Sequence, residues 1–99
     1  MFGLTGNYNY YIHQGSTDMR CGIDKLSYIV RTKMRKDPCG GDVFIFMSKS
    51  RKVVKILRAE GSAFVLYEKR LTKERYLRPI YNEDMGCYQM SWNSFVLLM

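Results

Sequence analysis

The chain has 99 residues, a formal net charge of +7 and 46% apolar residues, which fits one small globular domain over residues 1–99 and excludes a large multi-domain enzyme. The apolar and aromatic fractions, 46% and 14%, are too high for a disordered tail. No apolar run approaches the roughly 20 residues of a membrane-spanning helix, and the uncharged first seventeen residues do not resemble a signal peptide, so we expect a soluble, cytoplasmic protein with no membrane partner.

The first predicted elements are a strand and an amphipathic helix. Residues 7–12 alternate between two faces, which is typical of a half-buried strand. Ser16 or Thr17 is then expected to cap a helix, and residues 37–38, Asp-Pro, are expected to end it near Lys36. Apolar residues recur three or four positions apart along one face of this helix: Met19, Ile23, Leu26, Val30 and Met34.

Three predicted strands follow, joined by short polar turns. Residues 43–47 are continuously apolar, which predicts a central strand that is covered on both faces. The polar segment 48–52 and the turn at residues 60–61 separate further strands at residues 53–59 and 63–67. Consecutive strands with such short turns predict an antiparallel meander.

The C-terminal part ends in a predicted short helix. Residues 76–79 are expected to be extended and residues 82–86 to form a loop, and Ser91 is expected to cap a helix over residues 92–98. The predicted fold class is therefore α+β. In it, an antiparallel β-meander is joined by an N-terminal strand, one amphipathic helix packs on the sheet, and a short helix ends the chain.

Cysteine and histidine usage gives little support to metal or cofactor chemistry. The chain has three cysteines, Cys21, Cys39 and Cys87, without a C-x-x-C pair, and His13 is its single histidine. A zinc site needs about four ligands at short spacing, so we expect no metal and no cofactor, with the cysteines filling core or loop positions. The scattered acidic residues also suggest no acid and base pair, so an enzyme is weakly supported.

The basic residues are concentrated in the middle of the chain. All sixteen lie between Arg20 and Arg78, a stretch with only six acidic residues. Clustered positive charge is typical of a protein that binds a polyanion, although a solvated surface that keeps a small protein soluble is the alternative. The residues predicted to contact nucleic acid lie on and beside one hairpin: Lys49, Arg51, Lys52, Lys55, Arg58, Lys69 and Arg70.

Two motifs, with the basic hairpin between them, resemble a known family. One is Asp-Met-Arg-x-Gly-x-Asp, and the other is Lys-Arg-Leu at residues 69–71. Over nearly the whole chain, the sequence resembles the TnpB-type accessory protein of the IS-sixty-six family of bacterial insertion sequences, which is unrelated to the RNA-guided nuclease of that name. The resemblance implies a small companion of a separate transposase, needed for mobility of the element. The family motif comprises Asp18, Met19, Arg20, Gly22 and Asp24.

The chemistry of the family motif allows a structural or a binding role. Asp18 and Arg20 are two positions apart, so on a helix they would not share a face, and a direct ion pair between them is not expected. Asp18 suits the start of the helix, where it would cap the helix or compensate its dipole. Arg20 or Asp24 could instead reach another strand. An ion pair that fixes helix to sheet and a nucleic-acid contact both remain open.

Three functions are compatible with the sequence. The first is binding of DNA by the basic hairpin in support of the transposase, since hairpins fit the major groove and cations neutralise phosphates. The second is a protein adaptor for the transposase without direct DNA binding, and the third is a toxin-type ribonuclease, suggested only by size, charge and fold class. The adaptor would use aromatic anchors among Tyr76, Tyr81, Tyr88 and Trp92.

Overall fold

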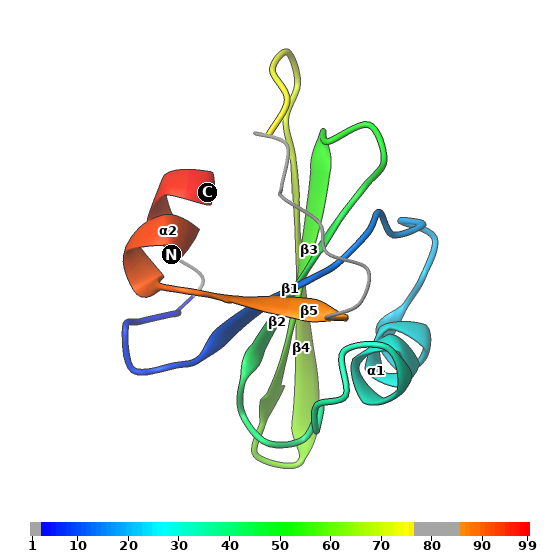
Figure 1. Ribbon diagram of the computed structural model, residues 1–99, viewed down its shortest axis with the longest axis vertical. Coiled ribbons are helices and arrows are strands. Elements are labelled where there is room, and N and C mark those ends of the chain that lie inside the picture. Colours follow the sequence, from blue (N-terminus) through cyan, green and yellow to red (C-terminus); the bar gives the residue numbers. More distant parts are fainter. Residues whose placement is uncertain (1–2, 77–85) are drawn as a thin grey trace.

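The computed structural model describes residues 3–76 and 86–99, which form one mixed sheet with a helix on each face (Figure 1). The spatial order of the strands is β4-β3-β2-β1-β5. The predicted α+β class is confirmed. The elements are β1 (Tyr10–His13), α1 (Ile23–Thr32), β2 (Val43–Met47), β3 (Val53–Glu60), β4 (Ala63–Arg70), β5 (Cys87–Met90) and α2 (Trp92–Leu98).

Strand pairing confirms the predicted meander but not a wholly antiparallel sheet. Strands β2, β3 and β4 pair antiparallel in chain order, with Ile56 of β3 opposite both Ile45 and Tyr67. Strand β1 instead pairs parallel with β2, because α1 carries the chain back to the end at which β1 began. Strand β5, which the sequence did not predict, pairs antiparallel with the free side of β1.

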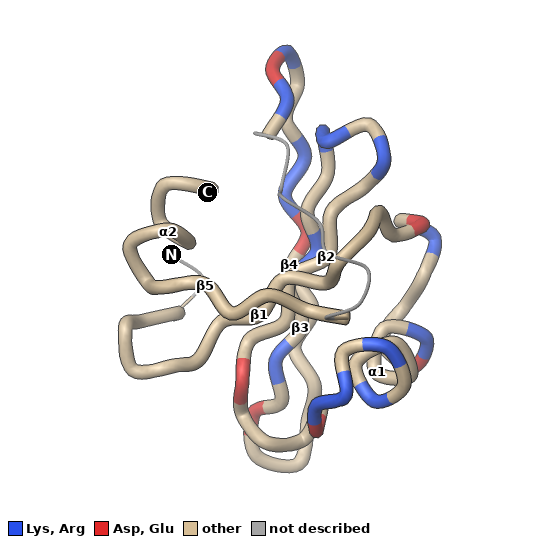
Figure 2. The backbone as a smooth tube through the Cα atoms, in the orientation of Figure 1, with Lys and Arg blue, Asp and Glu red and all other residues tan. Residues whose placement is uncertain are grey.

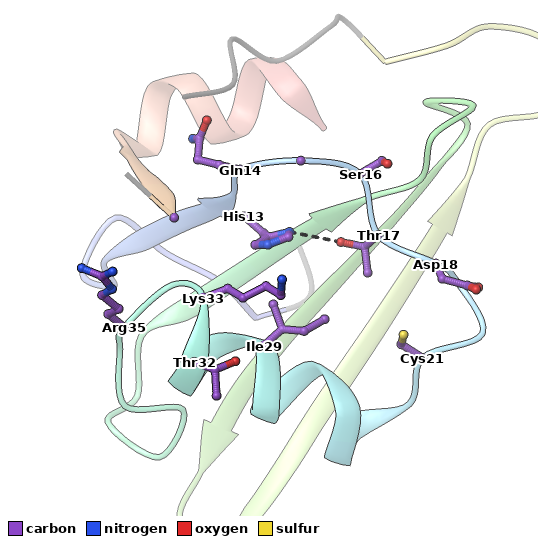
Figure 3. A pocket seen from close by; sticks show the side chains of 12 residues that line it. His13, Gln14, Ser16, Thr17, Asp18, Cys21, Ile29, Thr32, Lys33 and Arg35 are labelled. Carbon is purple, nitrogen blue, oxygen red and sulfur yellow. Dashed lines mark hydrogen bonds between the residues drawn. The ribbon is translucent and has the colours of Figure 1, made fainter. Parts of the chain in front are cut away.

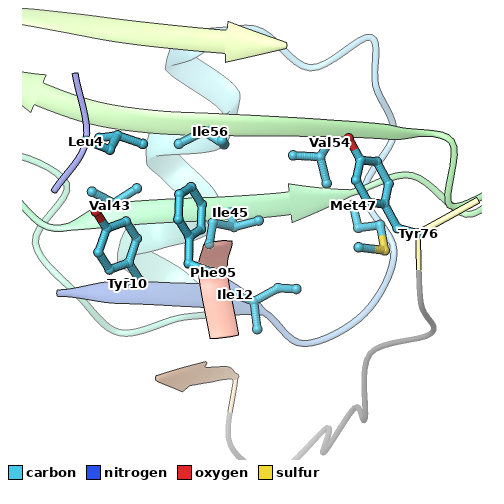
Figure 4. Close-up of a cluster of buried hydrophobic side chains, with 10 residues drawn as sticks. All are labelled: Leu4, Tyr10, Ile12, Val43, Ile45, Met47, Val54, Ile56, Tyr76 and Phe95. Carbon is cyan, nitrogen blue, oxygen red and sulfur yellow. The ribbon is translucent and has the colours of Figure 1, made fainter. Parts of the chain in front are cut away.

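The core lies on both faces of the sheet. All five residues of β2 are fully buried, as predicted for a central strand. Successive side chains of a strand point to opposite faces, so Phe44 and Phe46 pack with the apolar stripe of α1. On the other face, Phe95 of α2 belongs to a cluster with Leu4, Tyr76 and side chains of three strands (Figure 4). The strand residues are Tyr10 and Ile12 of β1, Val43, Ile45 and Met47 of β2, and Val54 and Ile56 of β3.

Helix α1 begins later than predicted. Its N-cap is Gly22, which has no side-chain cap, so the predicted cap at Ser16 or Thr17 is wrong. Thr17 is instead fixed to the sheet, because its backbone N–H donates to the carbonyl of Met47 at 2.8 Å. Residues 14–22 therefore form a loop that leads from β1 to the helix, and Met19 packs against the α1 core from that loop.

Local hydrogen bonds set the end of α1 and the start of α2. α1 ends at Thr32, before the predicted end near Lys36, and the Lys36 N–H donates to the carbonyl of Val30 at 3.0 Å. Between them, Arg35 has a left-handed backbone with φ +58°. The predicted cap of α2 is confirmed, because the hydroxyl of Ser91 accepts from the backbone N–H of Ser94.

The predicted turns at 48–52 and 60–61 connect β2 to β3 and β3 to β4. The predictions for residues 76–79 and 82–86 fall largely on residues 77–85, outside the described residues. No helix in the described part of the chain is long and apolar enough to cross a membrane.

Candidate nucleic-acid interface

The tip of the β2–β3 hairpin and the end of β4 lie together and carry a cluster of cations (Figure 2). Val53 pairs with Arg70 in the sheet, and the N–H of Leu71 donates to the carbonyl of Lys52 at 2.7 Å. The chain then returns past Arg51, whose carbonyl accepts from the N–H of Tyr76 at 2.7 Å. We call this cluster the basic end: Lys49, Arg51, Lys52, Lys69, Arg70, Lys73 and Arg75.

Several cations of the basic end have no partner of their own. Within residues 3–76 and 86–99, the side chains of Lys49, Lys52, Lys73 and Arg75 make no hydrogen bond or ion pair. Lys73 and Arg75 were not singled out from the sequence. The density of basic residues immediately after β4 was the signal that could have identified them.

The three other members of the basic end are engaged within the fold, and one of them is Arg70, whose Nη2 lies 4.0 Å from a carboxylate oxygen of Glu68. The Nζ of Lys69 donates to the carbonyl oxygen of Met99 at 2.6 Å, which ties β4 to the C-terminal helix. Arg51 has a left-handed backbone with φ +61°, and its Nη1 lies 3.5 Å from the carbonyl oxygen of Tyr76. The four cations that have no partner among the described residues therefore offer charge to a ligand.

The structure places Lys55 and Arg58 away from the basic end. Both side chains are about nine-tenths buried, and their positions on β3 put them on opposite faces of the sheet. Lys55 Nζ donates to the carbonyl of Cys21 at 2.8 Å and lies 3.9 Å from a carboxylate oxygen of Glu68. Arg58 Nη1 donates to the hydroxyl of Tyr8 at 2.9 Å. We therefore leave both out of the interface that we propose below.

The family motif forms a local ion pair, so the prediction against a direct pair is wrong. Arg20 donates to Asp18 from its backbone N–H at 2.9 Å, and its guanidinium Nη2 lies 2.7 Å from Oδ2. The argument from helical faces fails because both residues precede the helix. Asp18 is likewise no helix cap. Gly22 occupies the N-cap, and exposed Asp24 supplies the acid in the first turn of α1.

The pair has a titration that can be measured. Hydrogen bonds from Arg20 lower the pKa of Asp18 from 3.8 to about 2. We expect Arg20→Ala to return that pKa toward 3.8, measured by carbon NMR of the carboxyl group during acid titration. A lowered pKa of Asp18 stabilises the folded state at pH values above the pKa of the unfolded chain, and this contribution is lost as the pH falls through the pKa of the folded state. Because the ion pair is exposed to solvent, we expect little change in the free energy of unfolding. An unchanged pKa in the variant would contradict this cause.

A second surface carries no charge at all. Residues 3–13 and 86–99 contain no Lys, Arg, Asp or Glu and include β1, β5 and α2 (Figure 2), and we call them the uncharged lobe. Leu97 is 85% exposed and Tyr88 57% exposed. Tyr76 is buried, so the prediction that it is an exposed aromatic anchor is wrong. Trp92, another predicted anchor, is partly buried. Tyr81 lies outside the described residues.

The cysteines and acids form no obvious chemical centre. Cys21, Cys39 and Cys87 are free thiols. Burial raises the pKa of Cys87, which disfavours its reactive thiolate form. Within the described residues, no three His, Cys, Asp or Glu side chains are grouped so that they could hold a metal ion.

Comparison with known proteins identifies relatives of this chain. The family model described as "IS66 Orf2 like protein" matches residues 8–99. The uncharacterized protein y4hO of Sinorhizobium fredii is 33% identical over 73 residues, covering 74% of this chain and 64% of that protein. The uncharacterized protein y4jC of the same organism is 29% identical over 82 residues, covering 83% and 68%. The matched part spans about two thirds of each relative. No solved structure matches the chain.

Proposed function

This chain belongs to the IS66 Orf2-like family, and we propose that it is a non-catalytic accessory protein that binds duplex DNA through the basic end and so assists the transposase of its element. Membership places the protein in the insertion-sequence system. The observation that supports DNA binding is a group of four cations at one end of the sheet, none of which has a partner in the part of the chain that the structure describes. Such a group would attract and neutralise phosphates.

The shape of the basic end also supports this proposal. A two-stranded ribbon fits the major groove of DNA, and here the β2–β3 turn projects beside the segment that follows β4 (Figure 2). Lys49 and Lys52 lie on the turn, while Lys73 and Arg75 lie on the following segment. Contacts from both would span the phosphates without reading base sequence.

Salt dependence of DNA binding tests this proposal. At about 0.9 for each contact, about four to five phosphate contacts predict that log K falls with log salt at a slope of about −3.6 to −4.5 on duplex DNA. Fluorescence anisotropy on the terminal repeats of the element and on an unrelated duplex of equal length would measure the slope. Affinity that does not change with salt, or no binding in low salt, would reject DNA binding by the basic end.

The arrangement of titratable groups supports a non-catalytic role. General acid and base catalysis needs a group whose pKa lies near the working pH. Asp18 is held ionised by Arg20, with a pKa of about 2. His13 is buried, and its Nδ1 lies 3.4 Å from the hydroxyl of Thr17. These two groups favour an accessory role over a toxin-type ribonuclease.

The uncharged lobe supports a second candidate function, that of a protein adaptor. Exposed apolar side chains on a surface without charge are typical of protein contacts. We expect Leu97→Asp to weaken binding to the transposase more than tenfold in a titration with purified proteins, if Leu97 is an anchor. Tyr28→Asp is the matched control, because Tyr28 is 62% exposed but lies on α1, outside the lobe. Equal effects of both changes would argue against the lobe.

A further inference from the structure

A cleft of about 610 Å³ lies between the β1–α1 loop, one side of α1 and Gly86 (Figure 3). Its volume is that of sites that hold small organic ligands. Strand β1 contributes His13, the loop contributes Ser16 and Thr17, and the helix contributes Ile29. The cleft is separate from the basic end, and it has no part in the DNA contacts proposed above.

The charges that line the cleft are unbalanced. Lys33 and Arg35 both line it, and neither forms an ion pair with a described residue. Asp18 is the single acidic residue among the lining residues, and both of its carboxylate oxygens accept hydrogen bonds from Arg20. The Asp18 carboxylate is therefore already paired with Arg20, and within residues 3–76 and 86–99 the two cations that line the cleft have no counter-ion.

The side chain of Lys33 extends toward His13 and Thr17 in the cleft (Figure 3). Its charge acts on the buried imidazole, since burial and Lys33 together lower the pKa of His13. The hydroxyl of Thr17 forms a hydrogen bond with Nδ1 of His13, and Nε2 of His13 makes no hydrogen bond with any described residue. A neutral imidazole and a hydroxyl group therefore lie beside an ammonium group, a set that hydrogen-bonds to phosphate oxygens.

Arg35 occupies a backbone position that normally favours glycine. It follows α1 with φ +58°, where the Lys36 N–H closes the end of the helix on Val30. A residue with a Cβ is strained in this conformation, and glycine is the usual residue at this point of a helix end. No contact within the described fold offsets this strain, because the Arg35 side chain has no hydrogen-bond or ion-pair partner among the described residues. Arg35 lines one side of the cleft, where its side chain points away from His13 and from the Lys33 ammonium group (Figure 3).

We propose that this cleft binds a phosphate monoester carried on a small organic group, with Lys33 and Arg35 supplying the positive charge. Ser16 and His13 would donate to the remaining phosphate oxygens. The same chemistry is present in a free mononucleotide and in the 5′-phosphate at the end of a nucleic-acid strand. Neither source requires the groove-binding hairpin, so this site can exist whether or not the basic end binds duplex DNA.

Isothermal titration with adenosine 5′-monophosphate, adenosine and inorganic phosphate tests the proposal, with NMR shifts of the His13 ring locating the site. We expect the monophosphate to bind at the cleft and adenosine to bind at least tenfold more weakly, since adenosine lacks the charged hydrogen bonds of the phosphate group. A 5′-phosphorylated trinucleotide and its 5′-hydroxyl counterpart distinguish the two sources. Binding of the phosphorylated strand indicates a strand end, and its failure while the monophosphate binds indicates a free mononucleotide. Equal binding of adenosine and its monophosphate overturns the proposal.

Two variants separate binding from folding. Arg35→Gly should raise the melting temperature, because it relieves the left-handed strain, and yet weaken the monophosphate about tenfold or more. Lys33→Gln should weaken it to a similar extent with the fold intact by circular dichroism. Arg31→Gln, at an exposed position of α1 outside the cleft, is the control and should leave binding unchanged. Normal binding by both Arg35→Gly and Lys33→Gln would overturn the proposal.

Discussion

Gly86→Ala is expected to destabilise the fold by about 2–5 kcal/mol, a large fraction of the stability of a small domain. Gly86 has φ +69°, and a Cβ atom there would overlap the backbone carbonyl oxygen of Lys33 and lie 3.1 Å from its carbonyl carbon. The left-handed conformation accounts for about 1–2 kcal/mol and the overlap for about 1–3 kcal/mol. Both atoms belong to the backbone, so no side-chain rotation relieves the overlap.

The effect matters because Gly86 joins distant parts of the chain. Its carbonyl accepts from the N–H of Gln14 at 3.1 Å, and the next residue, Cys87, pairs with His13. A shift at Gly86 would therefore separate β5 from β1 and from the end of α1. Urea unfolding followed by circular dichroism measures the loss.

Gly61→Ala is the matched control for this prediction. Gly61 has φ +59°, and a Cβ atom there would meet nothing within 4 Å. Gly61→Ala should therefore lower the free energy of unfolding only by the cost of the left-handed conformation, about 1–2 kcal/mol. If the two alanine variants unfold at the same urea concentration, the close approach of Gly86 to Lys33 is not a source of destabilisation.

The elements that the sequence predicted well are those whose signal is local. The unbroken apolar run of β2 required burial on both faces, and the hydroxyl of Ser91 is a strong helix cap. Strand β5 has only four residues, and its pairing with β1 joins residues from 74 positions apart, at His13 and Cys87, to 80 positions apart, at Tyr10 and Met90, so no local pattern predicts it. The parallel pairing of β1 and β2 could have been predicted, because a helix between two strands is the usual crossover for a parallel pair.

The candidate sites show the same division between local and distant information. From the sequence, Lys55 and Arg58 belong to a run of basic residues and were predicted to contact nucleic acid. Their partners, the carbonyl of Cys21 and the hydroxyl of Tyr8, lie 34 and 50 positions earlier. The apolar residues around both cations in β3 were a sign that the strand is buried.

The cleft beside α1 depends on a helix that starts later than its apolar stripe indicates. Met19 packs with that stripe from a loop, so spacing alone extended the helix through the family motif. With the helix start placed at Ile23, residues 14–22 become free to form the wall of the cleft and the Asp18–Arg20 pair.

The triple change Lys49→Gln, Lys52→Gln and Lys73→Gln is expected to weaken duplex DNA binding roughly 10²–10³-fold at about 0.1 M salt. Each lost phosphate contact removes about 0.9 from the salt slope, so the slope should become flatter by about 2.7. None of the three side chains has a partner in the described fold, so thermal unfolding should change little. Stability and DNA binding would then respond separately, as expected for a surface that contacts a ligand.

A variant of equal net charge shows whether the position of these cations matters. Lys25→Gln, Arg31→Gln and Lys36→Gln remove the same charge from α1 and the segment after it, away from the basic end. If DNA binding uses the basic end, this control should keep most of its affinity and nearly the whole salt slope, because distant charges are screened beyond about 10 Å at 0.1 M salt. Equal losses in both variants would mean that the protein attracts DNA by its net charge alone. Normal DNA binding by the first variant, with loss of transposase binding, would instead identify the hairpin as a protein-docking surface.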